Sequence, residues 1–461
     1  MKKKLMIYGI GTFFSKILVF LMVPIYTRLF STSDYGYYDV VISDIQMLIS
    51  ISCVEIWSGI LRFMYTGDKK EIPIKCYLQL CPVMFVVYSL LMFVLSHYIT
   101  IKYPVIVFAY GILYLFYTVG NTICRGYGKN IDYVLSGLIY TLVSSVISIL
   151  FSLKLEFGIK GLFYAQCIGY LTSIVYIEIK TKAYQKALKM KSTRHDIENI
   201  LEYSLPLMLN SFSFLFLGTY NKNIILKQLG EYESGLYAFV LKFSAIFSII
   251  ISIYSLAWQE QAFSVSNEKD NTQIYEYYVN KFLKVVGFAT PCFIFGVYFF
   301  APFIGGSSYI DSNKYIALSI SATFISEVSG VLSVIIAVYR KTFQTFISTF
   351  IGAVVNVILA QLLIVKLGVN GSSIALNAGF LVAAMLRYLF VKIDIKFKLN
   401  VFYICFYFIE VVAFIICVHS TNTKLLLFYG GAVLVIWFVW MFKDLKIILN
   451  EIVSRIRRKE K

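Results

Sequence analysis

The chain has 461 residues, of which 59% are hydrophobic and only 15% charged, with a formal net charge of +17. Soluble domains carry about 25% charged residues, so this composition excludes an ordinary soluble protein and predicts a polytopic membrane protein. The positive charge does not indicate nucleic-acid binding, because the lysines cluster in short loops without a basic helix face or an aromatic RNA-reading motif. Basic loops beside anionic lipid explain this charge more simply.

Apolar segments long enough to cross ~30 Å of hydrocarbon recur from one end of the chain to the other. We expect all of them to be helices, because a helix in lipid satisfies its own backbone groups. Fourteen spans are predicted near residues 5–27, 37–61, 77–99, 104–123, 131–153, 159–179, 204–226, 235–257, 283–304, 315–338, 343–365, 371–391, 400–418 and 425–442. The first follows a basic start like that of a signal peptide. Its long apolar part, with no small-residue cleavage site after it, predicts a retained span.

The lysines and arginines support this number of spans. With the N-terminus inside, 31 of the 42 fall in inner segments and eight in outer loops. This is the positive-inside pattern, and one missed span in the middle of the chain would destroy it. The sequence therefore predicts a multi-pass membrane protein with both termini on the cytoplasmic side.

Two segments with similar features lie 199 residues apart. The segment "TRLFSTSDYGYYDV" (27–40) aligns with "LKQLGEYESGLYAF" (226–239), and the alignment pairs Gly36 with Gly235. Both segments follow a predicted span, and the first is expected to be a turn on the outer side. The pairing indicates an internal repeat.

A second pair of segments has a similar spacing. The segment "GIKGLFYAQCIGYL" (158–171) aligns with "GVNGSSIALNAGFL" (368–381) at five identical positions. Small residues also recur in membrane helices because they permit close packing, which is the alternative explanation. The agreement in order favours a duplicated six-helix unit, whose copies are related by an axis along the membrane normal with the substrate site between them. The expected layout is an N-lobe (1–180), a basic cytoplasmic linker (181–203), a C-lobe (204–391), two further spans (400–442) and a basic tail (443–461).

Ionic side chains within spans are functional candidates, because each costs at least ~2.5–3.5 kcal/mol in the bilayer interior. Lys16, Lys222 and Lys242 lie within spans one, seven and eight, and Glu327 is an isolated acid in span ten. A central cationic cavity would place Lys16 and Lys222 in corresponding helices of the two lobes. The alternative is that these long side chains reach the membrane surface.

Span two carries Asp44, Glu55 and Arg62. In a straight helix these residues project within about 20° of one line, which we expect to face the interior. There the acids would balance the lysines or exchange a coupling cation, and a structural ion pair is the alternative. Arg28 and Asp39 flank the outer turn and are predicted at the rim of the outer mouth.

Enzymatic motifs are missing from the sequence. It has no GxxxxGK[ST], GxSxG or HExxH pattern, and no outer loop exceeds about 20 residues. The eight cysteines fall mostly within apolar runs without CxxC or Cys/His spacing. We expect neither an enzyme nor a cofactor, and no ATP-driven mechanism.

A pattern of small, basic and turn-forming residues near the start resembles the polysaccharide transporters of the O-antigen flippase (Wzx) type, in the multidrug/oligosaccharidyl-lipid/polysaccharide (MOP) flippase superfamily. It comprises Gly11, Ser15, Lys16, Pro24, Thr27, Arg28, Asp34, Tyr35 and Gly36. The segments "RGYGK" (125–129), "YSLPL" (203–207) and "GLYAFVLK" (235–242) are similar to later landmarks of that family. Relatives often have an acid beside a basic residue in span seven, where this chain has asparagines on both sides of Lys222.

The resemblance implies an all-helical fold of two six-helix lobes and two C-terminal helices, working by alternating access. It also implies transport of an undecaprenyl-diphosphate-linked oligosaccharide from the inner to the outer leaflet of the bacterial cytoplasmic (inner) membrane. The implied partners are polysaccharide polymerase or assembly proteins, and the implied coupling ion is Na+ or H+. Cationic side chains suit the diphosphate. The candidates for substrate binding are Lys16, Arg28, Arg62, Lys222 and Lys242. The candidates for coupling or charge balance are Asp39, Asp44, Glu55 and Glu327.

Two other transporters share the predicted fold. A cation-coupled multidrug exporter usually relies on an acid in an early helix. Span one has Lys16 and no acid, which disfavours this alternative, but Asp44 and Glu55 in span two keep it open. A lipid II flippase is the other. A membrane glycosyltransferase or polymerase would need a large outer catalytic loop, which the sequence does not provide.

Overall fold

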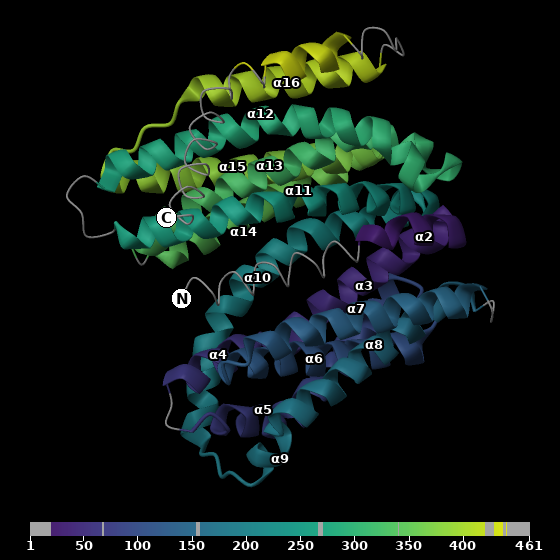
Figure 1. The fold of residues 1–461 in the computed structure, drawn as a ribbon, viewed down its shortest axis with the longest axis vertical. Helices are drawn as coiled ribbons and strands as arrows, with labels where there is room; N and C mark the ends of the chain where they lie inside the picture. The colour runs from purple at the N-terminus through teal and green to yellow at the C-terminus, as the bar shows by residue number, and fades with distance from the viewer. Residues whose placement is uncertain are drawn as a thin grey trace, which may run out of the picture.

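A computed structural model describes residues 20–66, 69–153, 157–265, 271–339, 341–419, 428–436 and 439, and all regular secondary structure within them is helical. Figure 1 labels the helices. In chain order they are α2 (Val23–Leu29), α3 (Thr32–Ser52), α4 (Ile56–Thr66), α5 (Ile72–Tyr98), α6 (Pro104–Gly126), α7 (Asn130–Leu153), α8 (Gly158–Thr181), α9 (Ala183–Leu188), α10 (Arg194–Leu229), α11 (Glu231–Ser264), α12 (Asn271–Gly305), the 3-10 helix η1 (Ser307–Ser312), α13 (Asn313–Val338), α14 (Thr342–Leu367), α15 (Val369–Ile395) and α16 (Val401–His419).

The described helices account for the predicted spans two to thirteen. Ten of them are long and apolar enough to cross a membrane, and there are up to twelve spans if each of two bent helix pairs counts as one. The predicted all-helical, multi-pass membrane fold is confirmed. Most of span one, the end of span fourteen and the basic tail (443–461) lie outside the described residues.

The helices form two bundles with separate hydrophobic cores (Figure 1). The first bundle contains α3 to α9 and the N-terminal part of α10, whose Ile197 and Ile200 pack in its core. The second contains the rest of α10 and α11 to α16, so the chain passes from one bundle to the other along α10. The helix α2 contacts both, since the Tyr26 hydroxyl bonds Ser148 of the first bundle at 3.0 Å and the Thr27 hydroxyl donates to the Ile304 carbonyl of the second at 3.2 Å.

Paired repeat positions share unusual backbone conformations. Gly158 and Gly368, which the second alignment pairs, have φ angles of 55° and 59°, and each stands at the start of a long helix. Lys182 and Lys396, which follow those two helices, are both left-handed at 50° and 53°. Left-handed φ is rare for residues with a side chain, so its recurrence supports the internal repeat on grounds other than composition.

Span two is not the straight helix that the sequence suggested. It breaks between α3 and α4, which are bent by 54°, and Val54 and Glu55 at the break both have positive φ. The single face predicted for Asp44, Glu55 and Arg62 is therefore not formed. Arg62 is exposed beyond the break, with its guanidinium 4.3 Å from the ring centre of Tyr203. Strained backbone of this kind clusters at functional sites.

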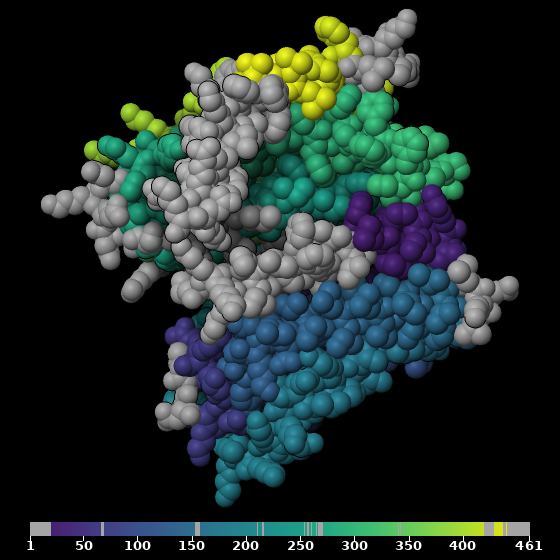
Figure 2. Space-filling view, viewed as in Figure 1, coloured from purple at the N-terminus to yellow at the C-terminus, as the bar shows by residue number. Residues whose placement is uncertain are grey.

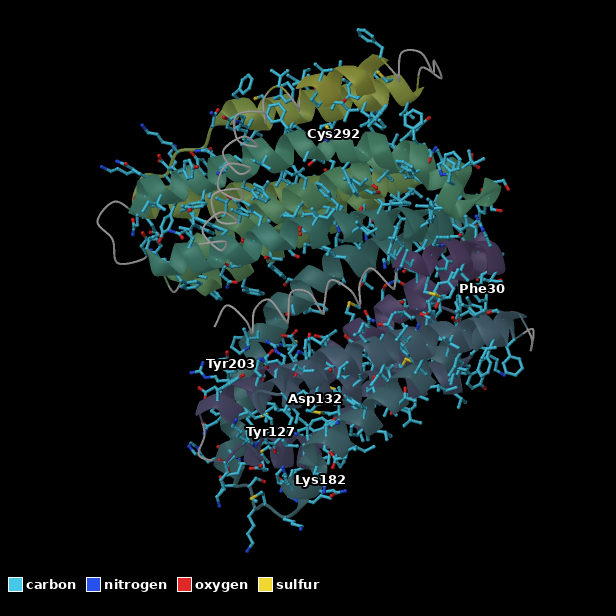
Figure 3. All side chains as sticks on the ribbon, viewed as in Figure 1. Phe30, Tyr127, Asp132, Lys182, Tyr203 and Cys292 are labelled. Atoms are coloured by element: carbon cyan, nitrogen blue, oxygen red, sulfur yellow. The ribbon has the colours of Figure 1, made fainter. Side chains whose placement is uncertain are left out.

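The two ends of the molecule differ in how the bundles meet. Phe30 lies at the end where α2 joins α3, and Tyr203 lies at the opposite end (Figure 3). We call the first of these the closed end, because α3 packs there directly against α10 and α11. In the space-filling view, α2 fills the seam between the bundles at this end (Figure 2).

Candidate functional site

The closed end is formed by two helices whose backbones touch. A Cβ atom on Gly36 of α3 would collide with the backbone of Gly235 and Glu231 in α11, and one on Gly235 would collide with the Thr32 carbonyl. Gly36 and Gly235 are the glycines that the first repeat alignment pairs. Their lack of a side chain permits this close crossing.

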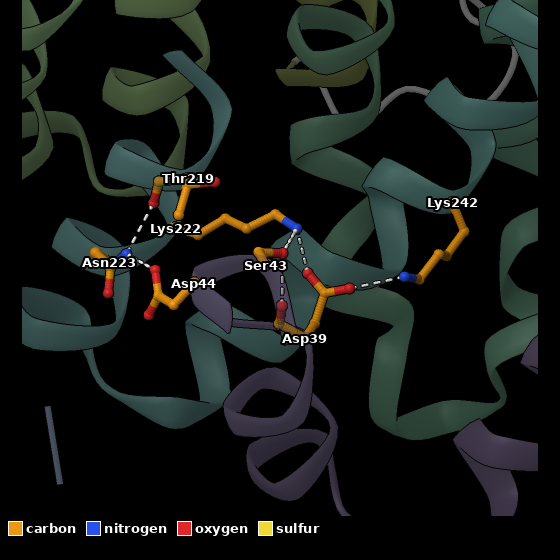
Figure 4. A network of polar contacts seen from close by, with 7 residues as sticks. All are labelled: Asp39, Ser43, Asp44, Thr219, Lys222, Asn223 and Lys242. Carbon is orange, nitrogen blue, oxygen red and sulfur yellow. Dashed lines mark hydrogen bonds and ion pairs between the residues drawn. The ribbon is translucent and has the colours of Figure 1, made fainter. Parts of the chain in front are cut away.

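An ion-pair cluster lies one turn further along α3, on the same interface (Figure 4). The carboxylate of Asp39, which is 7% exposed, accepts hydrogen bonds from Lys222 at 2.6 Å and Lys242 at 2.7 Å. Lys222 also bonds the Ser43 hydroxyl at 2.8 Å, and that hydroxyl donates to the Asp39 carbonyl. One acid of the first bundle thus holds two lysines of the second, and the counter-ion of Lys222 comes from α3.

Next to this cluster, Asp44 meets Asn223 across the interface. Asn223 donates to one carboxyl oxygen of Asp44 at 2.5 Å, and the other oxygen has no hydrogen-bond partner among the described residues. Asp44 is 1% exposed. The neighbouring Asn221 points the other way, into the second bundle, where it pairs with Asn356. A buried carboxyl oxygen without a hydrogen-bond partner is costly, and binding a proton or a cation would remove that cost.

A cavity of about 600 Å³ lies between the bundles, beyond Asp44 as seen from the closed end. The first bundle contributes Gln46, Ser50, Glu55, Trp57, Tyr114 and Thr118 to its wall. The second bundle contributes Ser211, Ser326, Ser329, Gly330, Ser333, Thr345, Thr349, Phe380, Ala383 and Arg387. This volume is typical of ligand sites, which measure about 300–1,000 Å³.

A smaller pocket of about 160 Å³ adjoins the cavity through Gln46, which lines both. Its wall includes Asp39 and Lys242 and five tyrosines, namely Tyr26, Tyr35, Tyr38, Tyr110 and Tyr140. The ring of Tyr140 stacks on that of Tyr170 with centroids 4.4 Å apart. Tyrosine combines an apolar ring with a hydroxyl, so this wall can stack on a ligand and hydrogen-bond to it.

The structure brings five of the predicted site residues to this interface and separates others from it. Asp39, Asp44, Lys222 and Lys242 meet at the interface, and Glu55 lines the cavity. Arg28 is exposed at the end of α2 and Arg62 is exposed on α4. Glu327 accepts a hydrogen bond from Ser248 within the second bundle at 2.5 Å. Lys16 lies outside the described residues.

Arg387 is a cavity residue that sequence reasoning missed. Because Arg387 falls near the end of an apolar run, the distribution of lysines and arginines places it with the basic residues of an inner segment. In the structure it is only 8% exposed and lines the cavity. Its guanidinium bonds Ser348, Ser329 and Thr349, which lie in α13 and α14. The sequence feature that could have indicated a buried arginine was the number of serines and threonines in the neighbouring spans, since their hydroxyls can accept its hydrogen bonds.

Two helix bundles with a polar cavity at their interface have the architecture of a transporter. Two solved structures share the fold. One is an inward-facing multidrug resistance MATE family transporter of the MOP superfamily, with a TM-score of 0.67 and 17% identity over 83% of this chain and 94% of that one. The other is the lipid II flippase MurJ in its inward closed conformation, with a TM-score of 0.68 and 14% identity over 95% and 99%. These likenesses show that this chain has the fold of the MATE transporters and of MurJ.

The profile of the family described as "Polysaccharide biosynthesis protein" matches residues 1–259, more than half of the chain, and the chain belongs to this family. One relative is an uncharacterized membrane protein of Methanocaldococcus jannaschii. It is 24% identical over 339 residues, which are 68% of this chain and 79% of that protein. The predicted family is confirmed by this match, and the fold expected from it is the one that the chain shares with the MATE transporter and MurJ.

Proposed function

We propose that this protein is a flippase that carries an undecaprenyl-diphosphate-linked oligosaccharide from the inner to the outer leaflet of a bacterial cytoplasmic membrane. The observation that carries the proposal is the cavity between the bundles, closed at one end by the Gly36–Gly235 crossing and the Asp39 cluster. Its wall of hydroxyls, amides and aromatic rings suits a glycan, which needs hydrogen bonds and stacking surfaces.

Alternating access follows from this arrangement. The Asp39 ion pairs and the Gly36–Gly235 crossing hold the bundles together at the closed end, so separating them there would open the cavity at that end. By the distribution of lysines, the closed end faces outward, so the cavity would receive its substrate from the cytoplasmic side. The transported glycan would then pass to the polymerase and assembly proteins of surface polysaccharide synthesis.

A complementation experiment tests this function. In a host that lacks its own copy of this gene, the wild-type protein is expected to restore surface polysaccharide. Cells with the variants Lys16→Ala or Lys222→Ala are expected to lack surface polysaccharide at unchanged protein abundance. Each substitution removes a cation that is proposed to bind the diphosphate or to hold the closed end together. The measurement is surface polysaccharide by gel and lipid-linked repeat units by mass spectrometry.

The matched control is Lys227→Ala, which removes a lysine from the last turn of the same helix as Lys222. It should behave like wild type. Normal polysaccharide in the Lys222→Ala and Lys16→Ala strains would contradict the assignment of these lysines. Restoration of lipid II export or drug resistance in place of polysaccharide would support one of the alternative transporters.

We further propose that Asp44 carries the coupling cation, Na+ or H+. Its buried position and unpaired oxygen support this role. Asp44→Asn is expected to make transport into proteoliposomes independent of an imposed gradient, because the amide cannot exchange a proton or balance a cation. The measurement is the initial rate with a proton gradient, with a sodium gradient and with neither.

Wild-type transport should accelerate with one of the two gradients. Glu55→Gln serves as a comparison, since Glu55 lines the cavity and is the second acid proposed for coupling. A wild-type rate that ignores both gradients would rule out coupling through either residue.

A further inference from the structure

We propose that Arg387 and the hydroxyl groups around it form the subsite that binds the phosphate groups of the transported lipid. This inference rests on the proposed function and adds to it which wall of the cavity holds the phosphates. Arg387 belongs to α15, and its guanidinium lies where α13, α14 and α15 meet the cavity.

Every hydrogen-bond partner of Arg387 is neutral. Nε donates to the Ser348 hydroxyl at 2.9 Å, Nη1 to the Ser329 carbonyl at 2.8 Å, and Nη2 to the Thr349 hydroxyl at 2.7 Å and the Thr345 carbonyl at 3.5 Å. No carboxylate among the described residues pairs with it. A buried charge without a counter-ion is expensive, so its retention in a transmembrane helix indicates a function.

The geometry leaves the guanidinium ready for an anion. These bonds use four of its five N–H groups, so one N–H of Nη1 has no acceptor among the described residues. Neutral oxygens orient the guanidinium without cancelling its charge. A planar, permanently charged guanidinium fixed in this way favours phosphate over neutral ligands.

The surrounding wall has space and further donors. The hydroxyls of Ser326 and Ser333 line the cavity beside Arg387, and Gly330 lies between them along α13. A Cβ atom on Gly330 would meet nothing within 4 Å, so this glycine leaves open space on the cavity side. A phosphate group would fit there with hydroxyls on both sides.

The depth of Arg387 suits a lipid head group. It lies eight residues before the last residue of α15, which is about 12 Å along the helix. The end of α15 is at the side opposite the closed end, where the distribution of lysines predicts the cytoplasm. The phosphates of a lipid that enters from this side would therefore reach Arg387 within about 12 Å of the end of α15.

The charges on the two walls give the ligand one orientation. Lys222 and Lys242 are held by Asp39 in this conformation, whereas Arg387 has no acid partner in the part of the chain that the structure describes. Glu55 lies on the opposite wall and would repel phosphate. The phosphates would thus bind to the second bundle, and the sugars would face Glu55 and Tyr114 of the first.

Binding measurements on the purified full-length protein test this subsite. The probes are undecaprenol, undecaprenyl monophosphate and undecaprenyl diphosphate, with affinity measured by native mass spectrometry. Wild type should bind the diphosphate most tightly and undecaprenol most weakly. Arg387→Met should bind the diphosphate roughly 10- to 100-fold more weakly, the loss expected for a hydrogen-bonded charged group, and undecaprenol as before.

Two further variants separate binding from folding. Arg387→Lys keeps the charge without the planar fork and should lie between wild type and Arg387→Met. Lys392→Met removes an exposed cation from the last turn of the same helix and should bind like wild type. If wild type prefers the diphosphate and both Arg387 variants keep this preference in full, the assignment of the subsite to Arg387 is wrong. The proposed function would then still stand. If wild type binds all three lipids equally, both are overturned.

Discussion

Replacing Asp39 with asparagine is expected to open the closed end and to abolish transport. The substitution keeps the shape of the side chain but leaves Lys222 and Lys242 facing each other's charge without a counter-ion. Removing one partner of a buried ion pair costs about 3–5 kcal/mol. A change of about 3 kcal/mol would lower the ratio of closed-end to open conformations roughly 150-fold relative to wild type.

The accessibility of the two lysines measures this change directly. In wild type, Lys222 and Lys242 should react slowly with a water-soluble amine reagent, and in Asp39→Asn both should react rapidly, as followed by mass spectrometry. The control Asp34→Asn changes an acid in the first turn of the same helix, where Asp34 serves the N-terminal cap with Ser31. It should leave the lysines protected.

A second substitution provides a rescue. Adding Lys242→Gln to Asp39→Asn removes one of the two unpaired cations and should restore part of the protection of Lys222. The interpretation of Asp39 as the acid that holds the bundles together would be wrong if the single variant protected both lysines as well as wild type does.

Replacing Gly235 with alanine is expected to have a comparable effect through sterics alone. The new Cβ would collide with the Thr32 carbonyl, and backbone atoms cannot rotate away as a side chain can. Overpacking of this kind costs about 1–3 kcal/mol, which α3 and α11 can relieve only by moving apart. We expect transport to fall sharply and the closed-end conformation to be disfavoured, with Gly36→Ala giving the same result.

Gly296→Ala is the matched control. Gly296 also lies within a helix, but a Cβ atom there would meet nothing within 4 Å. Alanine favours helix more than glycine by about 1 kcal/mol, so this variant should be neutral or slightly more stable. The measurements are thermal unfolding and transport in proteoliposomes. Equal behaviour of Gly235→Ala and Gly296→Ala would show that the close crossing has no role in transport.

The spans and the family were accessible from the sequence because they depend on local properties. An apolar segment of about 20 residues becomes a helix in lipid whichever helices surround it, since its backbone bonds are internal. Each of the predicted spans two to thirteen therefore corresponds to helical segments of the structure, although span two is broken into α3 and α4. The repeat alignment also paired Gly36 with Gly235, and these two glycines touch each other at the closed end.

The break in span two shows where a local argument fails. The helical projection of Asp44, Glu55 and Arg62 assumes 100° per residue without interruption, but Val54 and Glu55 take positive φ. Nothing in the residue types at the break requires this, because both positions normally avoid left-handed backbone. The bend and the exposure of Arg62 follow from how α3 and α4 pack against the other helices.

By itself, the sequence determined the all-helical membrane fold and the family, and it supplied most of the charges at the bundle interface. Only the tertiary structure decided which of those charges meet. Asp39 is paired with lysines that are 183 and 203 residues away, and Arg387 is buried among hydroxyls of two other helices. The physical reason is that hydropathy acts along one helix, whereas ion pairing depends on the lateral contact of helices from different bundles.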